Sequence, residues 1–389
     1  MRVPRILAIV LAGGKGSRLE ALTDTRPKPT LPIGGSFALI DVSLSNLVHA
    51  HISDVWVVEQ FRAGHLNAHL SNGRPWDLDR SHGGLVMAPP FEGGHGEGFA
   101  EGNADSLARQ LTAMREFDPE HVLVLSADHL YRLNYLDVLD THLQAEADLT
   151  VVTTQRSGDV SRYGVVDVNQ AGQLTGFEDK PEGRRDANVL TEVFLYRAES
   201  LFTALDTLLA EHNQLQDYGD ELLPHLLETH TVVAHELDGY WMDLGTLQSY
   251  WTANLHLVDG DAFALDDPDW PMYSAQPHRM PARLGAFARV TNSLVAGGST
   301  VHGQVEHSVI GVDAEVADGA VVRDSVLLEG AVVQSGVDLV NCIVDAGAQV
   351  TGPGQLGQPG FVTLIGADGG VAVRKELDDD SPLPRLGAE

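Results

Sequence analysis

The 389-residue chain has one cysteine, Cys342, and no uninterrupted apolar run of the ~18 residues that a membrane span needs. An internal disulfide is therefore excluded, and no membrane partner is expected. Basic residues are also scarce: 25 Lys and Arg stand against 55 Asp and Glu, for a formal net charge of −30. Because binding to a nucleic-acid backbone requires basic patches, nucleic acid is not an expected partner. A cytoplasmic protein of two domains suits this length and composition.

The first apolar run, residues 6–10, is short and passes directly into a glycine-rich loop. We interpret it as a first strand and not as a signal peptide, because no convincing cleavage site follows it. The loop, residues 11–19, is not a Walker A sequence, which needs Gly-Lys followed by Ser or Thr. It also lacks the third glycine of the dinucleotide fingerprint, since Leu19 stands in that position. Both common nucleotide motifs are thus excluded.

A glycine-dense loop after a buried strand still lets backbone N–H groups approach a phosphate, because glycine has no side chain and tolerates positive φ. Pro27 and Pro29 stiffen the segment that follows this loop. Four cations in the loop and this segment could together neutralise a triphosphate: Lys15, Arg18, Arg26 and Lys28. The pattern favours a phosphate-binding site, with a glycine-rich turn that binds no ligand as the alternative.

Up to about residue 260, short β-branched runs such as 55–58, 122–126 and 149–154 alternate with helical patterns. This alternation predicts an α/β domain with a Rossmann-like, mostly parallel sheet. Ligands of such sheets lie at the carboxyl ends of the strands. The glycine loop and Asp128 both follow strand ends of this kind.

After about residue 283, aliphatic residues recur every six positions among glycines and small polar residues, as in the row Ile310, Val316, Val322 and Leu328. Such a hexapeptide repeat is typical of a parallel β-helix, whereas β-hairpins have a period of two. We therefore predict the following organisation: an α/β domain at residues 1–265, a linker at 266–282, a β-helix at 283–360 and a mobile tail at 361–389.

Motifs along nearly the whole chain resemble those of the sugar-phosphate nucleotidyltransferases, and most closely those of the bacterial glucose-1-phosphate adenylyltransferases. They are the glycine loop and residues 26–29, 102–105, 127–131, 163–166, 178–181 and 239–246, followed by the hexapeptide region. The resemblance implies a catalytic domain joined to a left-handed parallel β-helix. It also implies that ATP and α-D-glucose 1-phosphate react to give ADP-glucose and pyrophosphate for glycogen-type glucan synthesis. Mg²⁺, a homotetramer and sugar-phosphate effectors are further implications.

The resemblance implies roles for individual residues. Asp128 and Asp243 would hold Mg²⁺, while Arg18 and Lys28 would hold the β- and γ-phosphates, and Lys28 is ambiguous because this family segment also contributes to effector binding. Arg18, Lys28 and Asp128 form the expected catalytic set. The expected nucleotide-binding residues are Leu11, Ala12, Gly13, Gly14, Gly16, Gly102, Ala104 and Asp105. The expected sugar-phosphate-binding residues are Tyr163, Gly164, Asp179, Lys180 and Glu192, with Lys180 on the phosphate.

Several of these residues have structural alternatives. Asp128 could cap the segment that follows it, Asp243 could be an ordinary loop residue, and Lys180 could be a solvated lysine. His129 receives no role. A nucleophilic Ser, Cys or His is not required, because a sugar 1-phosphate carries its own nucleophile and the protein needs only to align two polyanions and offset their repulsion.

The sequence also departs from the family. Ala127 stands in place of a glycine, and the family's Ser-Met-Gly stretch is replaced within residues 190–193, Leu-Thr-Glu-Val. A different sugar 1-phosphate, such as glucosamine 1-phosphate, or a different nucleoside triphosphate is therefore an alternative. A non-catalytic regulatory subunit is another, although the complete catalytic set argues against it.

Overall fold

A computed structural model describes residues 4–13, 17–24, 26–59, 63–88, 100, 102–212, 214–275 and 278–378. The chain forms two compact units. Unit 1 contains Met1–Gly14, Ser43–Ala127 and Arg132–Trp241, and unit 2 contains Lys15–Val42, Asp128–Tyr131 and Met242–Glu389. The chain thus passes between the units repeatedly. The organisation into 1–265, 266–282, 283–360 and 361–389 stays a prediction.

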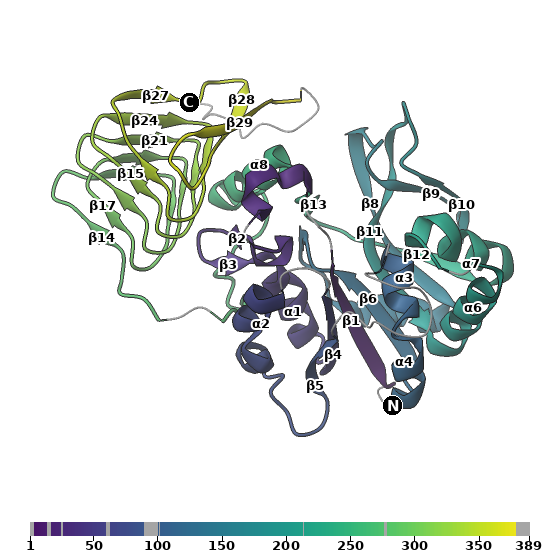
Figure 1. Ribbon diagram of the computed structural model, residues 1–389. Coiled ribbons are helices and arrows are strands. Elements are labelled where there is room, and N and C mark those ends of the chain that lie inside the picture. Colours follow the sequence, from purple (N-terminus) through teal and green to yellow (C-terminus); the bar gives the residue numbers. More distant parts are fainter. Residues whose placement is uncertain are drawn as a thin grey trace. The chain divides into compact units, whose positions relative to one another are not determined.

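Unit 1 is built on a nine-stranded mixed sheet with the order β10-β9-β11-β6-β1-β4-β5, in which β8 pairs with both β11 and β12 (Figure 1). The neighbours β6, β1, β4 and β5 run parallel, as predicted for a Rossmann-like sheet. In contrast, β11 is antiparallel to β6, β8 and β9. The strands are β1 (Ile6–Ala12), β4 (Asp54–Glu59), β5 (Gly84–Ala88), β6 (His121–Ser126), β8 (Leu149–Asp159), β9 (Gly164–Val168), β10 (Leu174–Asp179), β11 (Arg185–Arg197) and β12 (Val232–Glu236).

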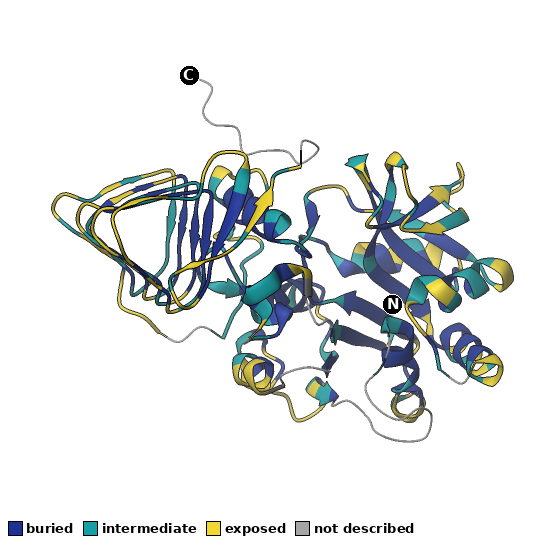
Figure 2. Ribbon diagram, turned by 45° about the horizontal axis from the view of Figure 1, so that its top comes forward, coloured by how far each residue is buried: buried dark blue, intermediate teal, exposed yellow. Residues whose placement is uncertain are grey.

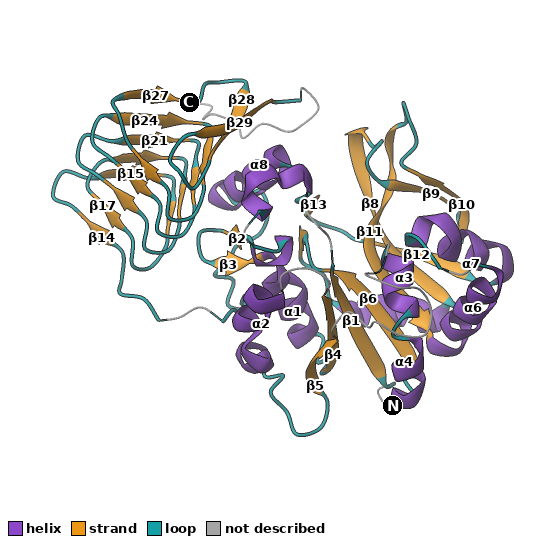
Figure 3. Ribbon diagram, in the orientation of Figure 1, coloured by secondary structure: helices purple, strands orange, loops and turns teal. Residues whose placement is uncertain are grey.

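Both faces of the central parallel strands β1 and β6 are buried, which explains why their sequences are continuous apolar runs (Figure 2). Leu7 and Ile9 of β1 belong to the core that includes α3 (Asn103–Ala108), α4 (Leu111–Phe117), α6 (Ala198–Glu211) and α7 (Leu223–Thr229). The alternate residues Ala8 and Val10 are equally buried. The other helices labelled in Figure 3 are α1 (Leu39–His49), α2 (Ala63–Leu70) and α8 (Leu247–Asp259). A further helix, α5, contains Tyr135–Gln144. None of the helices described is long and apolar enough to cross a membrane.

In unit 2, the region after residue 282 forms three parallel sheets, one for each face of a β-helix. The first sheet contains β14 (Arg283–Leu284), β17 (Thr300–Val301), β20 (Glu315–Val316), β23 (Val332–Val333) and β26 (Gln349–Val350). The second contains β15 (Arg289–Thr291), β18 (Gln304–Glu306), β21 (Val321–Arg323), β24 (Val337–Val340) and β27 (Gly354–Leu356). The third contains β16 (Leu294–Val295), β19 (Val309–Ile310), β22 (Val326–Leu327), β25 (Cys342–Val344), β28 (Phe361–Ile365) and β29 (Val371–Glu376). This architecture confirms the predicted parallel β-helix and is consistent with the left-handed form.

The interior ladders refine the six-residue pattern. Val316 and Val322 are fully buried on successive faces of the β-helix, as predicted. The next inward-facing strand residue is Leu327, which follows Val322 by five positions and pairs with Ile310 of the preceding coil. Leu328 is buried beside the ladder and does not belong to it. The spacing from the second face to the third is therefore five residues here, and not the six that the sequence pattern predicted.

Strand pairing in the third sheet continues past the predicted boundary at residue 360. β28 continues the third sheet by pairing in parallel with β25, and β29 folds back antiparallel on β28. The strand ladder thus extends to Glu376, because residues 361–365 supply a further apolar strand whose period differs from the hexapeptide row. Residues 379–389 lie outside the described residues.

His142 makes the stability of unit 1 sensitive to acid. Its side chain is 1% exposed, and its Nδ1 lies 2.9 Å from the Thr150 hydroxyl. Burial lowers the pKa of His142 to about 4, and the neighbouring His121 and Arg197 act in the same direction. Because the folded pKa is below the unfolded value, this group contributes its full stability above pH 6.5 and loses it as the pH falls toward 4.

We expect His142→Asn, which can keep the bond to Thr150 without titrating, to lose less stability in acid than the wild type. The difference between the two should change by up to ~3 kcal/mol between pH 7.5 and pH 4.5, since one pKa unit corresponds to ~1.4 kcal/mol. Thermal unfolding at several pH values measures it. Parallel melting curves for the two proteins across this range would contradict the prediction.

Candidate functional site

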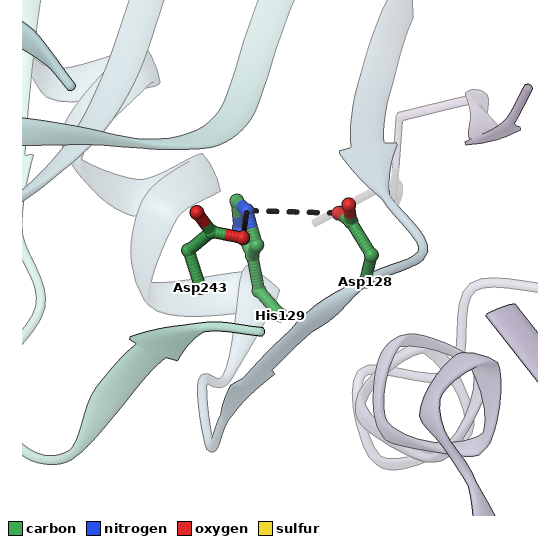
Figure 4. Close-up of side chains that lie close together, drawn as sticks. All are labelled: Asp128, His129 and Asp243. Carbon is green, nitrogen blue, oxygen red and sulfur yellow. Dashed lines mark ion pairs between the residues drawn. The ribbon is translucent and has the colours of Figure 1, made fainter. Parts of the chain in front are cut away.

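A short two-stranded sheet in unit 2 brings Asp128 and Asp243 together. Asp128 directly precedes β7 (His129–Tyr131), and Asp243 is the last residue of β13 (Trp241–Asp243), which pairs with β7. The Leu244 amide donates to the Asp128 carbonyl at 3.4 Å, which continues the contact beyond the strands. Two carboxylates that lie far apart in the sequence therefore meet, as Figure 4 shows.

The ammonium group of Lys28 lies between these carboxylates. Its Nζ is 2.5 Å from Asp128 Oδ2 and 3.4 Å from Asp243 Oδ1, and the lysine is 5% exposed. Lys28 begins the 3₁₀ turn η2 (Lys28–Thr30), which Pro27 precedes in an extended conformation. The carboxylate oxygens thus converge on a positive charge, as the ligands of a metal ion do, and a divalent cation fits the charge of this site.

His129 completes the cluster. Its Nε2 lies 3.6 Å from Asp128 Oδ1 and 3.8 Å from Asp243 Oδ1. The three side chains each offer one ligand atom, and all these atoms lie within 4.8 Å of one another. The prediction gave His129 no role, since nothing in the sequence shows which way a residue beside Asp128 points.

Gly245 leaves space beside this cluster. A Cβ at this position would lie 3.0 Å from Asp243 Oδ2 and 3.1 Å from Arg18 Nη2. Arg18, on the 3₁₀ segment η1 (Ser17–Thr23), is exposed and therefore accessible to an anion. The structure thus places Arg18, Lys28, Asp128 and Asp243 in one region of unit 2.

Arg26 does not join the predicted phosphate cations. Its Nη2 lies 3.2 Å from Oδ1 of Asp345, which follows β25 in the β-helix and is 4% exposed. Burial raises the pKa of Asp345, and the charge of Arg26 acts in the opposite direction. The guanidinium is therefore used to fix its segment to the β-helix.

The predicted nucleotide residues that the structure describes lie in unit 1. Leu11, Ala12 and Gly13 occupy the end of β1 and the position after it, whereas Gly14, Lys15 and Gly16 lie outside the described residues. Leu11 lines a small hollow together with Asn103, Ala104, Ser126, Glu192 and Tyr218, among others.

Two residues near this hollow serve the packing of α3. A side chain at Gly102 would overlap the backbone of Gln216, so only glycine fits there. Asp105 is 3% exposed and pairs with Arg109 at 3.0 Å, and it accepts a hydrogen bond from Gln214. A role for Asp105 in nucleotide binding stays a prediction, because these partners hold its carboxylate.

Four of the predicted sugar-phosphate residues meet at one end of the β9–β10 hairpin. Asp179 faces Gly164 across the strands, and the Lys180 amide donates to the Tyr163 carbonyl at 3.1 Å. Lys180 Nζ lies 2.9 Å from Asp179 Oδ2. Burial alone would lower the pKa of Lys180, but its hydrogen bond to Asp179 and the surrounding negative charges raise it. The ammonium is therefore charged, and about half of the Lys180 side chain is exposed.

Glu192 lies in an irregular part of β11, where the register to β8 shifts between Leu190 and Phe194. Its φ of 57° is in the left-handed region, which glycine adopts more easily. Sequence reasoning missed its neighbour Tyr218, whose pKa is raised well above the usual value by burial and then by the charges of Glu192 and Asp179. No periodic pattern marks Tyr218, so only the fold reveals this contact.

Comparison with known proteins agrees with both parts of the fold. The model of the nucleotidyl transferase family matches residues 7–260, and that of the GlmU-like C-terminal hexapeptide region matches residues 280–359. The chain belongs to the nucleotidyl transferase family.

Curated relatives of this nucleotidyltransferase carry the name glucose-1-phosphate adenylyltransferase. The protein of Clostridium perfringens is 36% identical over 82% of this chain and 82% of its own length. That of Thermotoga maritima is 38% identical over 82% of this chain and 76% of its own length. That of Bacillus cereus is 35% identical over 82% of this chain and 86% of its own length.

The position of Lys28 generates a prediction about cation exchange at the cluster. In Lys28→Met, a divalent ion no longer has to displace an ammonium, so Mn²⁺ should bind roughly tenfold more tightly, since a charged hydrogen bond is worth ~1.5–3 kcal/mol. Isothermal titration with Mn²⁺ measures the affinity, with Lys375→Met as a control at an exposed lysine that pairs with Glu20. Unchanged or weaker binding in Lys28→Met would show that the ammonium and the metal ion do not compete.

Proposed function

We propose that the chain is a glucose-1-phosphate adenylyltransferase, which forms ADP-glucose and pyrophosphate from ATP and α-D-glucose 1-phosphate. The observation that carries this proposal is that Asp128 and Asp243 both contact the buried ammonium of Lys28. Asp128 lies just after the end of the parallel strand β6. The names of the relatives support the choice of substrates. The product would serve glycogen-type glucan synthesis.

The reaction needs alignment and charge neutralisation. A phosphate oxygen of the sugar 1-phosphate forms a bond to the α-phosphorus of ATP, and the bond from this phosphorus to the oxygen that bridges to the β-phosphorus breaks. Both electrons of that bond leave with pyrophosphate. Because the nucleophile is already an anion, the protein supplies fixed positive charge and no general base.

Asp128 and Asp243 would hold Mg²⁺ in this reaction. Bound there, the ion would supply positive charge to the reacting and leaving phosphates. Lys28 would then exchange its carboxylate partners for phosphate oxygens, and Arg18 would contact the same polyanion from its exposed position. The backbone after β1 would approach the nucleotide closely.

Lys180 would hold the phosphate of the sugar, since its ammonium lies at the end of the β9–β10 hairpin beside Tyr163 and Gly164. A side chain at Gly164 would lie 2.9 Å from the Phe177 ring, so this position stays small. Asp179 and Glu192 would accept hydrogen bonds from sugar hydroxyls.

An amino sugar 1-phosphate is a second candidate substrate. The described residues that line the hollow in unit 1 include the carboxylate of Glu192 and no lysine or arginine. A carboxylate in that setting could bind the ammonium group of glucosamine 1-phosphate, with a charged hydrogen bond worth ~1.5–3 kcal/mol.

Assembly into a homotetramer that responds to sugar-phosphate effectors is also part of this proposal. Three large apolar side chains in and just before the first coil of the β-helix are strongly exposed: Met280 (78%), Leu284 (57%) and Phe287 (84%). Exposed apolar groups of this kind favour burial against another subunit.

A matrix of nucleoside triphosphates and sugar 1-phosphates tests the function. With Mg²⁺, we expect ATP and glucose 1-phosphate to give ADP-glucose and pyrophosphate in equal amounts. Asp128→Asn and Asp243→Asn should each lower the rate about a hundred- to several-thousand-fold, or ~3–5 kcal/mol of transition-state stabilisation. Asp269→Asn is the control, because Asp269 is exposed in the same unit. Rates within threefold of wild type in both site variants would refute the metal assignment, and a preference for glucosamine 1-phosphate would select the second candidate.

Lys180→Ala separates the two substrates. The loss of a charged contact to the sugar phosphate should raise the KM for this substrate roughly tenfold or more and leave the KM for ATP nearly unchanged. Steady-state kinetics with each substrate varied in turn measure both values. An equal rise in both KM values would remove Lys180 from the sugar-phosphate site.

A further inference from the structure

The imidazole of His129 is held against both carboxylates of the cluster. His129 is the first residue of β7 and is 3% exposed, so packing fixes its ring. Figure 4 shows the ring extending toward Asp128 and Asp243. Its Nε2 is 3.6 Å and 3.8 Å from their nearest oxygens, which is longer than a hydrogen bond.

These distances suit three ligands of one ion. Bonds from nitrogen or oxygen to small divalent ions are about 2.0–2.2 Å long. Two ligand atoms around one ion are therefore about 3 Å apart at a right angle and about 4 Å apart when opposite. Both measured distances fall in this interval, and all three ligand atoms lie within 4.8 Å of one another, so one ion between them is within reach of all three side chains after small side-chain movements.

We propose, on the basis of the function proposed above, that His129 Nε2 is a direct ligand of the divalent ion and makes the site prefer Mn²⁺ or Co²⁺ over Mg²⁺. Carboxylate oxygens alone suit Mg²⁺, which keeps several waters and seldom takes nitrogen ligands. Imidazole favours the transition metals, and the affinity of such sites rises from Mn²⁺ to Co²⁺. One neutral nitrogen beside two carboxylates therefore shifts the choice of metal without changing the charge of the site.

Lys28 limits when this ligand set forms. Its ammonium lies on the same two carboxylates, so an ion that contacts all three ligands takes the place of the Lys28 charge. The exchange replaces the single positive charge of the ammonium with the two positive charges of the divalent ion. Full coordination therefore accompanies movement of Lys28 toward another anion, such as a triphosphate.

Metal binding to the full-length protein tests the role of His129 without any turnover. Mn²⁺ binding is followed by electron paramagnetic resonance, and Mg²⁺ binding by competition with Mn²⁺. In His129→Gln and His129→Ala, the ratio of the Mg²⁺ and Mn²⁺ dissociation constants should fall about tenfold or more, because even the loss of an outer-shell partner weakens metal binding 10- to 100-fold. The Mg²⁺ affinity itself should change less than threefold.

Two controls separate the possible failures. Asp128→Asn keeps the imidazole and removes a carboxylate, so it should abolish binding of both ions; if it does not, the metal site of the proposed function is wrong. His82→Ala removes an exposed histidine and reports adventitious binding. If Asp128→Asn abolishes binding while the His129 variants keep the wild-type metal ratio, only the role of His129 is refuted.

A spectroscopic measurement decides the point even if the His129 variants fold poorly. In the presence of a non-hydrolysable ATP analogue, which gives Lys28 another anion, spin-echo spectra of Mn²⁺ bound to the wild-type protein should show coupling to an imidazole nitrogen, and the coupling should change when the histidines carry ¹⁵N. Bound Mn²⁺ without nitrogen coupling would overturn the proposal.

Discussion

Two carboxylates brought close together require a cation, and this electrostatic requirement accounts for the buried position of Lys28 beside them. Asp128 and Asp243 are both largely buried, so their mutual repulsion is poorly screened by water. Lys28 offsets this repulsion, and in doing so it draws a third segment of the chain to the β7–β13 pair. The cluster therefore holds a cation, the Lys28 ammonium, between its two carboxylates.

The segment that carries Lys28 is fixed from the side of the β-helix. Arg26 pairs with Asp345 of the β-helix, and the hydroxyl of Tyr250 on α8 donates to the Pro32 carbonyl. The indole of Trp251, also on α8, donates to the Asp324 carbonyl in the β-helix at 2.7 Å. The hexapeptide region therefore does more than stack its own coils, since within unit 2 it supports the position of a residue at the cluster.

Local sequence patterns predicted the parts of the fold that depend on local periodicity. The apolar run of β1, the interior valines of the β-helix and the place of Asp128 after a buried strand could all be read from neighbouring residues. The partners of Lys28, Arg26 and His129 could not, because each contact joins residues that are remote in the sequence or depends on which way a side chain points. The strands β28 and β29 were missed since they follow a different period from the repeat that precedes them.

The central claim is that the cluster of Asp128, His129 and Asp243 exchanges the Lys28 ammonium for a divalent ion. Anomalous diffraction at the manganese edge, from crystals grown with Mn²⁺ and a non-hydrolysable ATP analogue, tests it most directly. The account predicts one strong peak within bonding distance of both carboxylates and of His129 Nε2, with Lys28 Nζ moved onto a phosphate oxygen. A structure in which Mn²⁺ lies elsewhere while Lys28 still bridges Asp128 and Asp243 would contradict it.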